Sequence, residues 1–202
     1  MEATPRIELG MEVLQTSALP LGYVAATFPN PILPARSGPP YSWRDVAERA
    51  FLDVMAHLPA GVVVISTRAG EEFRGLTASS LVSISLEPPM VLVGLERESL
   101  TRAAILDHKA FNVSLLTRSQ EFIADRFAGR APSIDSKWTT LPHHLGANGI
   151  PLVEGCAAWL ECRVVQVHPA GDHDVFVGEV QAAATGRGDP LILWDRSFWS
   201  LH

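Results

Sequence analysis

Long apolar runs are missing from this sequence of 202 residues. A membrane-spanning helix needs roughly 20 consecutive apolar residues, whereas the longest runs, near Val62 to Ile65 and Met90 to Leu95, have the length of strands. The first ten residues carry acidic side chains and lack the basic and apolar regions of a secretory signal. We therefore expect a cytoplasmic protein with no membrane partner.

Short motifs for nucleotides, metals and nucleophiles are also missing. The sequence contains neither G-x-G-x-x-G nor G-x-x-x-x-G-K-[ST], which excludes a Rossmann fingerprint and a P-loop. No H-E-x-x-H, Cys-rich metal spacing or G-x-S-x-G element is present, so hydrolase and metalloenzyme functions are weakly supported and we expect no metal. Any nucleotide must be bound by another kind of site.

Basic residues and cysteines are few. Lys and Arg number 16 against 22 Asp and Glu, and their even spread argues against a nucleic-acid partner, which needs clustered positive charge. Cys156 and Cys162 fall in one expected strand, where six residues span roughly 20 Å. That separation forbids a disulfide between them. We expect both to be buried as small apolar residues.

Apolar residues, in contrast, are plentiful. They make up 47% of the chain, and the mean hydropathy of +0.15 indicates that self-association hides part of the surface, so we expect a homodimer. Residues 1–41 form an extended, Pro-rich N-terminal arm, because Pro at this density prevents regular helices and central strands. The arm also holds many apolar residues, which we expect to pack on the body or on a partner subunit.

The pattern of residues 42–202 predicts one mainly β domain. A helix is expected from Ser42, with Asp45 in a capping arrangement, to a point before Pro59. Helices are also predicted to open at Ser99 and Ser119, and a long loop over residues 130–149. Strands are predicted at Gly61–Thr67, Gly75–Ile84, Met90–Leu95, Phe111–Leu116, Cys156–Val167, Val175–Ala184 and Leu191–Trp194. Short strands without regular helix alternation favour an antiparallel barrel.

Two short segments could hold a nucleotide. From Gly75 to Ser80, a glycine and small hydroxyl residues offer backbone N–H groups and little bulk along one strand edge, which suits a flat ring. An ordinary polar strand and turn explains this segment equally well. The helix opening at Glu98 to Thr101 provides free backbone donors and two hydroxyls for a phosphate. Plain N-capping by Ser99 is the better explanation of that opening in isolation.

The sequence as a whole resembles the flavin reductase-like, FMN-binding split-barrel family over roughly residues 45 to 201. Members with this pattern are reductase components of two-component flavin-dependent monooxygenases. No single motif is diagnostic, but the ordered set is specific: Phe51 to Met55, Pro59 to Ile65, Gly75 to Ser80, Ser83-x-Ser85-x-x-Pro88-Pro89, Ser99-x-Thr101, Phe111-Asn112-Val113-x-Leu115, Phe127-Ala128, Cys162, Gly171-Asp172-His173-x-x-x-x-Gly178-Glu179-Val180 and Pro190-Leu191.

The resemblance implies an antiparallel split β-barrel with a few helices, assembled as a homodimer, and it assigns roles to residues. His173 would position NAD(P)H, with Asp172 as a weaker second, although a turn between two strands is the simpler explanation of Gly171-Asp172-His173 without the family. The remaining residues would surround FMN or FAD: Thr77, Ala78, Ser79 and Ser80 along the ring, Ser83 and Pro89 nearby, Ser99 and Thr101 at the phosphate, and Phe111, Asn112 and Val113 beside it.

The implied reaction is hydride transfer from a nicotinamide to the flavin, with reduced flavin passed to a partner monooxygenase. Such a reaction needs two rings stacked at roughly 3 to 3.5 Å and no displaced-pKa acid, base or nucleophile. Two other functions stay open. The chain could hold FMN tightly as an electron carrier or as an oxidoreductase for a quinone or corrinoid, or it could be a dimeric scaffold that has lost flavin.

Overall fold

The computed structural model describes residues 48–129 and 138–201. The expected arm over residues 1–41, its packing, and the capping pair Ser42 and Asp45 lie outside these ranges. The described helices are α3 (Glu48–Ala56), α4 (Leu100–His108), the short 3₁₀ helix η2 (Arg118–Gln120) and α5 (Glu121–Phe127). None of the described helices is both long and apolar enough to cross a membrane.

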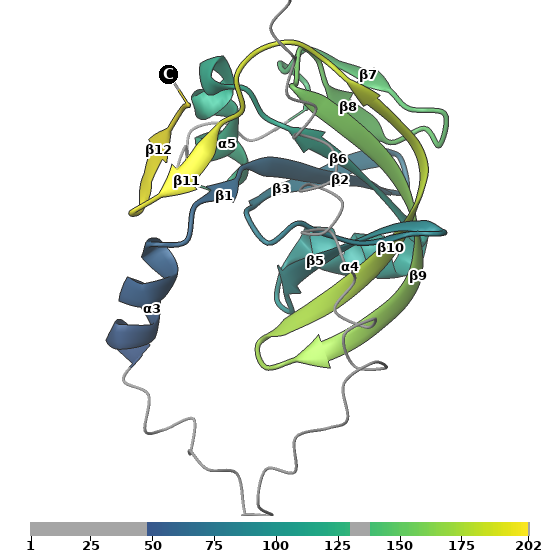
Figure 1. The fold of residues 1–202 in the computed structure, drawn as a ribbon. Helices are drawn as coiled ribbons and strands as arrows, with labels where there is room; N and C mark the ends of the chain where they lie inside the picture. Colours follow the sequence, from purple (N-terminus) through teal and green to yellow (C-terminus); the bar gives the residue numbers. More distant parts are fainter. Residues whose placement is uncertain (1–47, 130–137, 202) are drawn as a thin grey trace, which may run out of the picture.

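Strands dominate the described chain, as predicted, and every pairing between them is antiparallel. A large curved sheet has the order β3-β2-β6-β9-β10-β5-β4, and two small sheets have the orders β1-β11-β12 and β7-β8 (Figure 1). The strands are β1 (Ala60–Gly61), β2 (Val63–Ala69), β3 (Glu72–Ala78), β4 (Val82–Leu86), β5 (Pro89–Glu96), β6 (Ala110–Leu115), β7 (His143–Leu145), β8 (Pro151–Val153), β9 (Ala158–Ala170), β10 (His173–Thr185), β11 (Ile192–Trp194) and β12 (Ser197–Trp199).

The core lies on both faces of β2, which explains the unbroken apolar run at its start. Successive side chains of a strand point to opposite faces. Val63 and Ile65 therefore join one cluster with Phe111 and Phe176, whereas Val64 joins a second cluster with aromatic and aliphatic residues of α5 and the C-terminal segment. Burial of each large apolar side chain contributes roughly 1.5–3 kcal/mol. The two clusters fix β2 and β3 between α4 and α5.

The expected strand from Gly75 to Ile84 is broken, because Ser79 to Leu81 leave the sheet between β3 and β4. The Ser80 hydroxyl explains the break. Its Oγ donates to the Gly94 carbonyl at 3.0 Å and accepts from the Gly94 N–H at 3.2 Å. The Ser80 side chain thus occupies the N–H and C=O groups of Gly94, which the backbone of β4 would otherwise bind if that strand continued to Ser80. Ser79 and Ser80 line the site described below.

The expected loop over residues 130–149 contains β7, which pairs with β8 in a hairpin that the sequence did not predict. Long-range contacts hold this hairpin. The buried Glu161 carboxylate on β9 accepts the backbone N–H groups of Ala147 and Asn148, both at 3.1 Å. A further correction concerns Cys156, which precedes β9 and does not share that strand with Cys162. Both cysteines are free and buried, as predicted.

Candidate functional site

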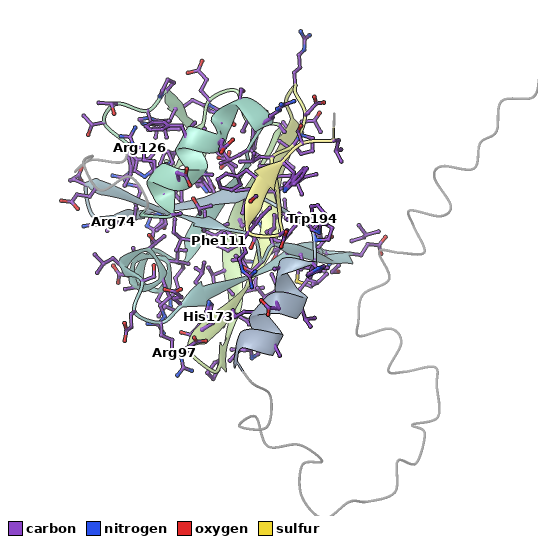
Figure 2. All side chains as sticks on the ribbon, turned by 90° about the vertical axis from the view of Figure 1, so that its left-hand side faces the viewer. Arg74, Arg97, Phe111, Arg126, His173 and Trp194 are labelled. Carbon is purple, nitrogen blue, oxygen red and sulfur yellow. The ribbon has the colours of Figure 1, made fainter. Side chains whose placement is uncertain are left out.

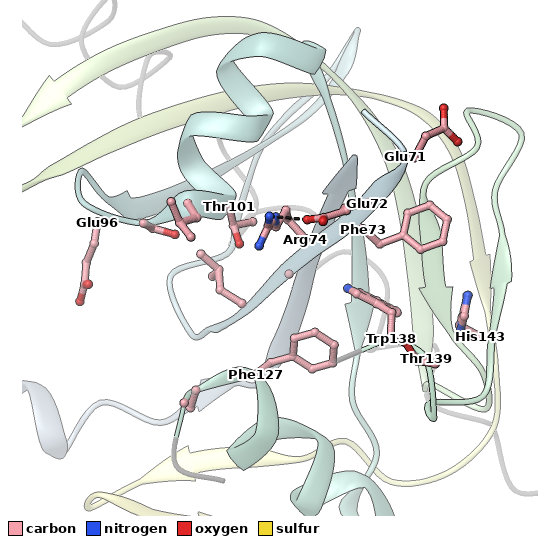
Figure 3. Close-up of a pocket in the computed structure, with 16 residues that line it drawn as sticks. Glu71, Glu72, Phe73, Arg74, Glu96, Thr101, Phe127, Trp138, Thr139 and His143 are labelled. Carbon is pink, nitrogen blue, oxygen red and sulfur yellow. Dashed lines mark hydrogen bonds and ion pairs between the residues drawn. The ribbon is translucent and has the colours of Figure 1, made fainter. Parts of the chain in front are cut away.

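Two adjoining pockets run along β3, between α4 and α5. The smaller, of about 370 Å³, is lined by Leu76 to Ser80, Gly94 to Glu96, Ser99, Phe127, Ala128 and His173. The larger, of about 880 Å³, shares Leu76, Glu96, Ser99, Phe127 and Ala128 and extends to Phe73, Arg74, Thr101, Trp138 and His143 (Figure 3). The fold therefore brings Thr77 to Ser80, Ser99, Thr101 and His173 together, although up to 96 residues separate them in the sequence.

The wall from Thr77 to Ser80 is held in place by its own hydroxyl groups. Thr77 Oγ1 donates to the Ala124 carbonyl at 2.6 Å and so ties β3 to α5. Ser80 is bound to Gly94 of β5, as described above. Ala78 and Ser79 add little bulk, and Ser79 and Ser80 are exposed. The result is a low wall with backbone groups outside the strand ladder, which suits a flat ring laid against it.

The start of α4 borders both pockets. Ser99 is the N-cap of this helix, with its Oγ accepting the Arg102 N–H at 3.4 Å, so the capping interpretation is correct. This role does not compete with anion binding, because the first N–H groups of a helix have no partner within the helix and carry the positive end of its dipole. Thr101 is 5% exposed and is the second residue of the helix, within its first turn. The helix start can therefore hold a phosphate at the junction of the pockets.

The turn that carries His173 borders the smaller pocket next to β5, where His173 pairs with Glu96. Gly171 has a φ of 64°, the left-handed conformation that favours glycine in a tight turn. His173 Nδ1 donates to Asp172 Oδ1 at 2.7 Å, and this hydrogen bond lowers the pKa of the Asp172 carboxyl. A proton on Nδ1 leaves Nε2 as the nitrogen available to a ligand in the neutral ring. Figure 2 shows His173 and Arg97 close together at one end of the body.

Asp174 anchors this turn to α4. Its buried carboxylate accepts Arg97 Nε at 3.1 Å and Arg102 Nε at 2.8 Å, and Arg102 also donates through a terminal nitrogen. These hydrogen bonds, that from Arg102 above all, lower the pKa of Asp174. Because the backbone N–H of Arg102 also donates to Ser99 Oγ, the Asp174 carboxylate connects the His173 turn with the helix start.

Replacement of Asp174 by asparagine is expected to lower the thermal unfolding midpoint at pH 7. Since the folded-state pKa lies below the unfolded value of about 3.9, the ionised carboxylate stabilises the fold above that pH, and this contribution disappears as the pH falls through the folded value. The midpoints of Asp174→Asn and wild type should therefore converge in acid. Glu179→Gln, which breaks a more exposed ion pair with Arg163, serves as control and should change little at any pH.

Six predicted site residues lie outside both pockets, and one of them, Asp172, contacts His173 as described above. Ser83 on β4 and Pro89 on β5 are exposed on the edge hairpin of the sheet. Phe111, Asn112 and Val113 are fully buried, and Phe111 and Val113 belong to the apolar core. Figure 2 shows Phe111 in the interior of the body. Asn112 donates to Asn148 Oδ1 and to the Ile150 carbonyl at 3.1 and 3.0 Å, so it fastens the β7–β8 hairpin. Alternation along β6 turns Phe111 and Val113 into the apolar core and Asn112 to the opposite face, toward the hairpin.

Aromatic residues of the larger pocket were not recognised in the sequence. Phe73, Trp138 and His143 meet edge to face, with ring centroids 5.5 to 6.5 Å apart. Trp138 Nε1 is buried with no hydrogen-bond partner in the described part of the chain, a loss of on the order of 1–3 kcal/mol unless something else accepts its proton. Among the aromatic residues of this pocket, only Phe127 belonged to a sequence motif. Phe73, Trp138 and His143 are far apart in the sequence, so no local pattern links them.

The packing of Phe127 and Trp138 against β3 requires a glycine at position 75. A Cβ at this position would lie 2.9 Å from Phe127 Cε1 and 3.1 Å from Trp138 Cζ2. Both rings are buried, so neither can move away easily. The glycine that opens the Gly75 to Ser80 segment thus lets two aromatic rings pack against β3 and shape the pocket floor.

Residues 55–202 match the flavin reductase like domain. The chain belongs to this family. The flavin reductase is 35% identical over 156 residues to the reductase component of 4-hydroxyphenylacetate 3-monooxygenase from Thermus thermophilus, covering 75% of this chain and 95% of that protein. It is 38% identical over 149 residues to an NADH-dependent FAD reductase of Streptomyces globisporus, covering 72% and 81%.

The fold of this flavin reductase is shared with solved structures. It superimposes on the flavin reductase PheA2 in its native state with a TM-score of 0.73 at 28% identity, covering 78% of this chain and 99% of that one. The predicted family and the predicted activity of a nicotinamide-dependent flavin reductase are thereby confirmed. The mainly antiparallel β architecture is confirmed as well.

Proposed function

We propose that this flavin reductase uses NADH to reduce FMN or FAD in the pocket between β3 and α4, and releases the reduced flavin to a flavin-dependent monooxygenase. The observation that carries the proposal is the convergence of the wall Thr77 to Ser80, the start of α4 and His173 on one space. Named relatives support the choice of nicotinamide and of partner: an NADH-dependent FAD reductase and the reductase component of a monooxygenase.

Each part of the pocket has a separate task. The low wall from Thr77 to Ser80 receives the flat ring and offers backbone groups to its polar edge. The start of α4, with Ser99 and Thr101, neutralises the phosphate of the flavin tail. His173, oriented by Asp172, borders the space where the nicotinamide stacks on the flavin. With both nucleotides bound, the nicotinamide supplies a hydride that the flavin ring accepts, and the protein supplies the alignment.

A steady-state assay that crosses NADH and NADPH with FMN, FAD and riboflavin tests this function. We expect rapid NADH-dependent reduction and a protein that loses its yellow colour on dialysis, because the flavin is a diffusible substrate. A protein that stays yellow and is not reduced by NADH would instead support the tightly bound FMN carrier. Absence of flavin binding in a titration would support the scaffold.

Replacement of both Ser99 and Thr101 by alanine is expected to weaken FMN binding about tenfold and riboflavin binding much less. Only FMN has a phosphate, and loss of two hydroxyl contacts to a charged group on the order of 1–2 kcal/mol corresponds to that factor. Flavin fluorescence titrations measure both affinities. Because Ser99 caps α4, circular dichroism should first show that the double variant keeps its helix. Equal losses of FMN and riboflavin affinity would show that Ser99 and Thr101 do not bind the phosphate.

We also propose that the curved sheet closes as a split barrel within a homodimer. Helix α3 stands away from the large sheet in Figure 1, and Phe51, Leu52, Val54 and Leu58 are each more than half exposed. Trp194 and Trp199 on the neighbouring β11–β12 hairpin are also exposed, and the Arg196–Asp53 ion pair joins this hairpin to α3. An apolar surface of this kind is typical of a subunit interface.

Sedimentation of the full chain is expected to give about twice the mass of 21.9 kDa. A charge on the apolar face, in Val54→Glu, should shift the protein toward the monomer, because an unpaired carboxylate cannot be buried without a large cost. Glu71→Gln on the fully exposed β2–β3 turn is the control and should leave the mass unchanged. A wild-type monomer at micromolar concentration would contradict the dimer.

A further inference from the structure

The larger pocket continues well beyond the place where the flavin phosphate would bind. From Ser99 and Thr101 it passes Arg74 and Gly75 and reaches the rings of Phe73, Trp138 and His143, which we call the aromatic recess (Figure 3). The smaller pocket, with the ring wall and His173, lies on the other side of Ser99. FMN ends at its phosphate, which is placed at the start of α4. A ligand that fills both pockets must therefore be longer than FMN.

The aromatic recess has the chemistry of a site for a flat, nitrogen-rich ring. Its three side chains are packed edge to face, with interplanar angles of 75° to 78°, and Phe73 and His143 are only partly buried, so ring surface is still available. Bases stack on aromatic side chains with little dependence on their identity. The guanidinium of Arg68 lies over the Phe73 ring, 5.9 Å from its centroid. This cation–π contact helps to hold the ring in place.

Hydrogen-bonding groups in the recess match both kinds of polar atom on adenine. His143 Nδ1 donates to the Leu141 carbonyl at 2.7 Å, so Nε2 is the acceptor of the neutral ring. Glu71 and Glu72 add exposed carboxylates at the rim. These acceptors suit an exocyclic amine. The buried Trp138 Nε1, on the side of the ring that faces Arg74 and Thr101 in Figure 3, is an unpartnered donor among the described residues and suits a ring nitrogen or phosphate oxygen.

Arg74 is the basic residue that lines the pocket between the recess and the start of α4. Its guanidinium forms an ion pair with Glu72 on the same strand, and both side chains are substantially exposed. An exposed pair of this kind contributes little to stability, so Arg74 can exchange it for a diphosphate. Glu71, whose side chain is fully exposed, lies apart from Arg74 in Figure 3, whereas the Glu72 carboxylate pairs with Arg74 and would be displaced by the diphosphate.

We infer that the aromatic recess binds the adenine of FAD, that Arg74 together with the start of α4 binds its diphosphate, and that FAD is the preferred flavin of this enzyme. This inference rests on the proposed function and specifies its substrate. The same adenosine diphosphate group occurs in NADH. The recess is assigned to FAD because it continues from the start of α4, where the flavin phosphate is placed, whereas His173, which is assigned to the nicotinamide, lines only the smaller pocket.

Titration of the full chain with FAD, FMN and riboflavin, followed by flavin fluorescence, tests the inference. We expect FAD to bind about tenfold more tightly than FMN, a factor within the range that stacking of one base on aromatic side chains contributes. In Phe73→Leu, which keeps an apolar side chain, and in Arg74→Gln, the FAD affinity should fall to near the FMN value. Arg163→Gln breaks a comparable exposed ion pair outside the pocket and should keep the wild-type ratio.

The outcomes separate this inference from the proposed function. Equal wild-type affinities for FAD and FMN, with normal NADH-dependent reduction, would overturn the inference alone, and no reduction of any flavin would remove the function itself. A parallel loss of FAD and FMN affinity in Phe73→Leu would show a structural effect and overturn the adenine site. Phe73→Leu could instead raise the KM for NADH but not for reduced nicotinamide mononucleotide, and leave the ratio of FAD to FMN affinity unchanged. That result would assign the recess to NADH and overturn the choice of FAD.

Discussion

Replacement of His173 by alanine is expected to slow NADH-dependent flavin reduction on the order of 10- to 100-fold while flavin affinity stays within a few fold. The imidazole borders the smaller pocket, is about 40% exposed, and is held by Asp172 at 2.7 Å. Under the proposed function it contacts the nicotinamide and not the flavin tail. Hydride transfer depends steeply on the alignment of two rings, so loss of one wall of the nicotinamide space affects the rate more than flavin binding.

Stopped-flow reduction of enzyme-bound flavin by NADH measures this effect without interference from product release. Asp172→Asn should give a smaller loss, because the imidazole remains but loses the charged partner that orients it. His168→Ala is the matched control, since His168 is exposed on β9 and contacts Gln166 away from the pockets. An unchanged rate in His173→Ala would show that the assignment is wrong. A large loss of flavin affinity would place His173 in flavin binding instead.

Replacement of Gly178 by alanine is expected to reduce the free energy of unfolding by about 1–3 kcal/mol, the usual cost of overpacking a core. A Cβ at this position would lie 2.5 Å from Phe111 Cζ and 3.1 Å from Cys162 Cβ. Both neighbours are essentially fully buried, so neither ring nor strand can move without disturbing the core. The site also coincides with an irregularity in the β9–β10 register between Val177 and Gly178.

Chemical denaturation of Gly178→Ala, compared with Gly61→Ala, measures this cost. Gly61 has no atom within 4 Å of an added Cβ and adopts no left-handed conformation, so its replacement should be nearly neutral. The double variant Gly178→Ala with Phe111→Leu should recover part of the loss, because the smaller side chain relieves the contact. Equal stability of the two glycine variants would mean that Phe111 relaxes freely, contrary to the packing described.

Local sequence determined much of the architecture. Apolar alternation placed the strands because it depends only on which side chains can face a core, and β5, β6, β10 and β11 lie close to the predicted ranges. Ser99 was identified as a helix start because capping is a contact between neighbours in sequence. Gly171 and Asp172 likewise gave the turn before His173. The ordered motifs, taken together, were sufficient to indicate the family.

Tertiary structure alone decided the shape of the site. The break after Ala78 depends on the contact of Ser80 with Gly94, and the β7–β8 hairpin depends on Glu161 and Asn112 of other strands. The inward direction of Phe111 and Val113 follows from the register of β6 between β2 and β9. The aromatic recess joins Phe73 of β3, Trp138 of the segment before β7 and His143 at the start of β7. Such contacts link positions far apart in the chain, so a pattern confined to neighbouring residues carries no signal for them.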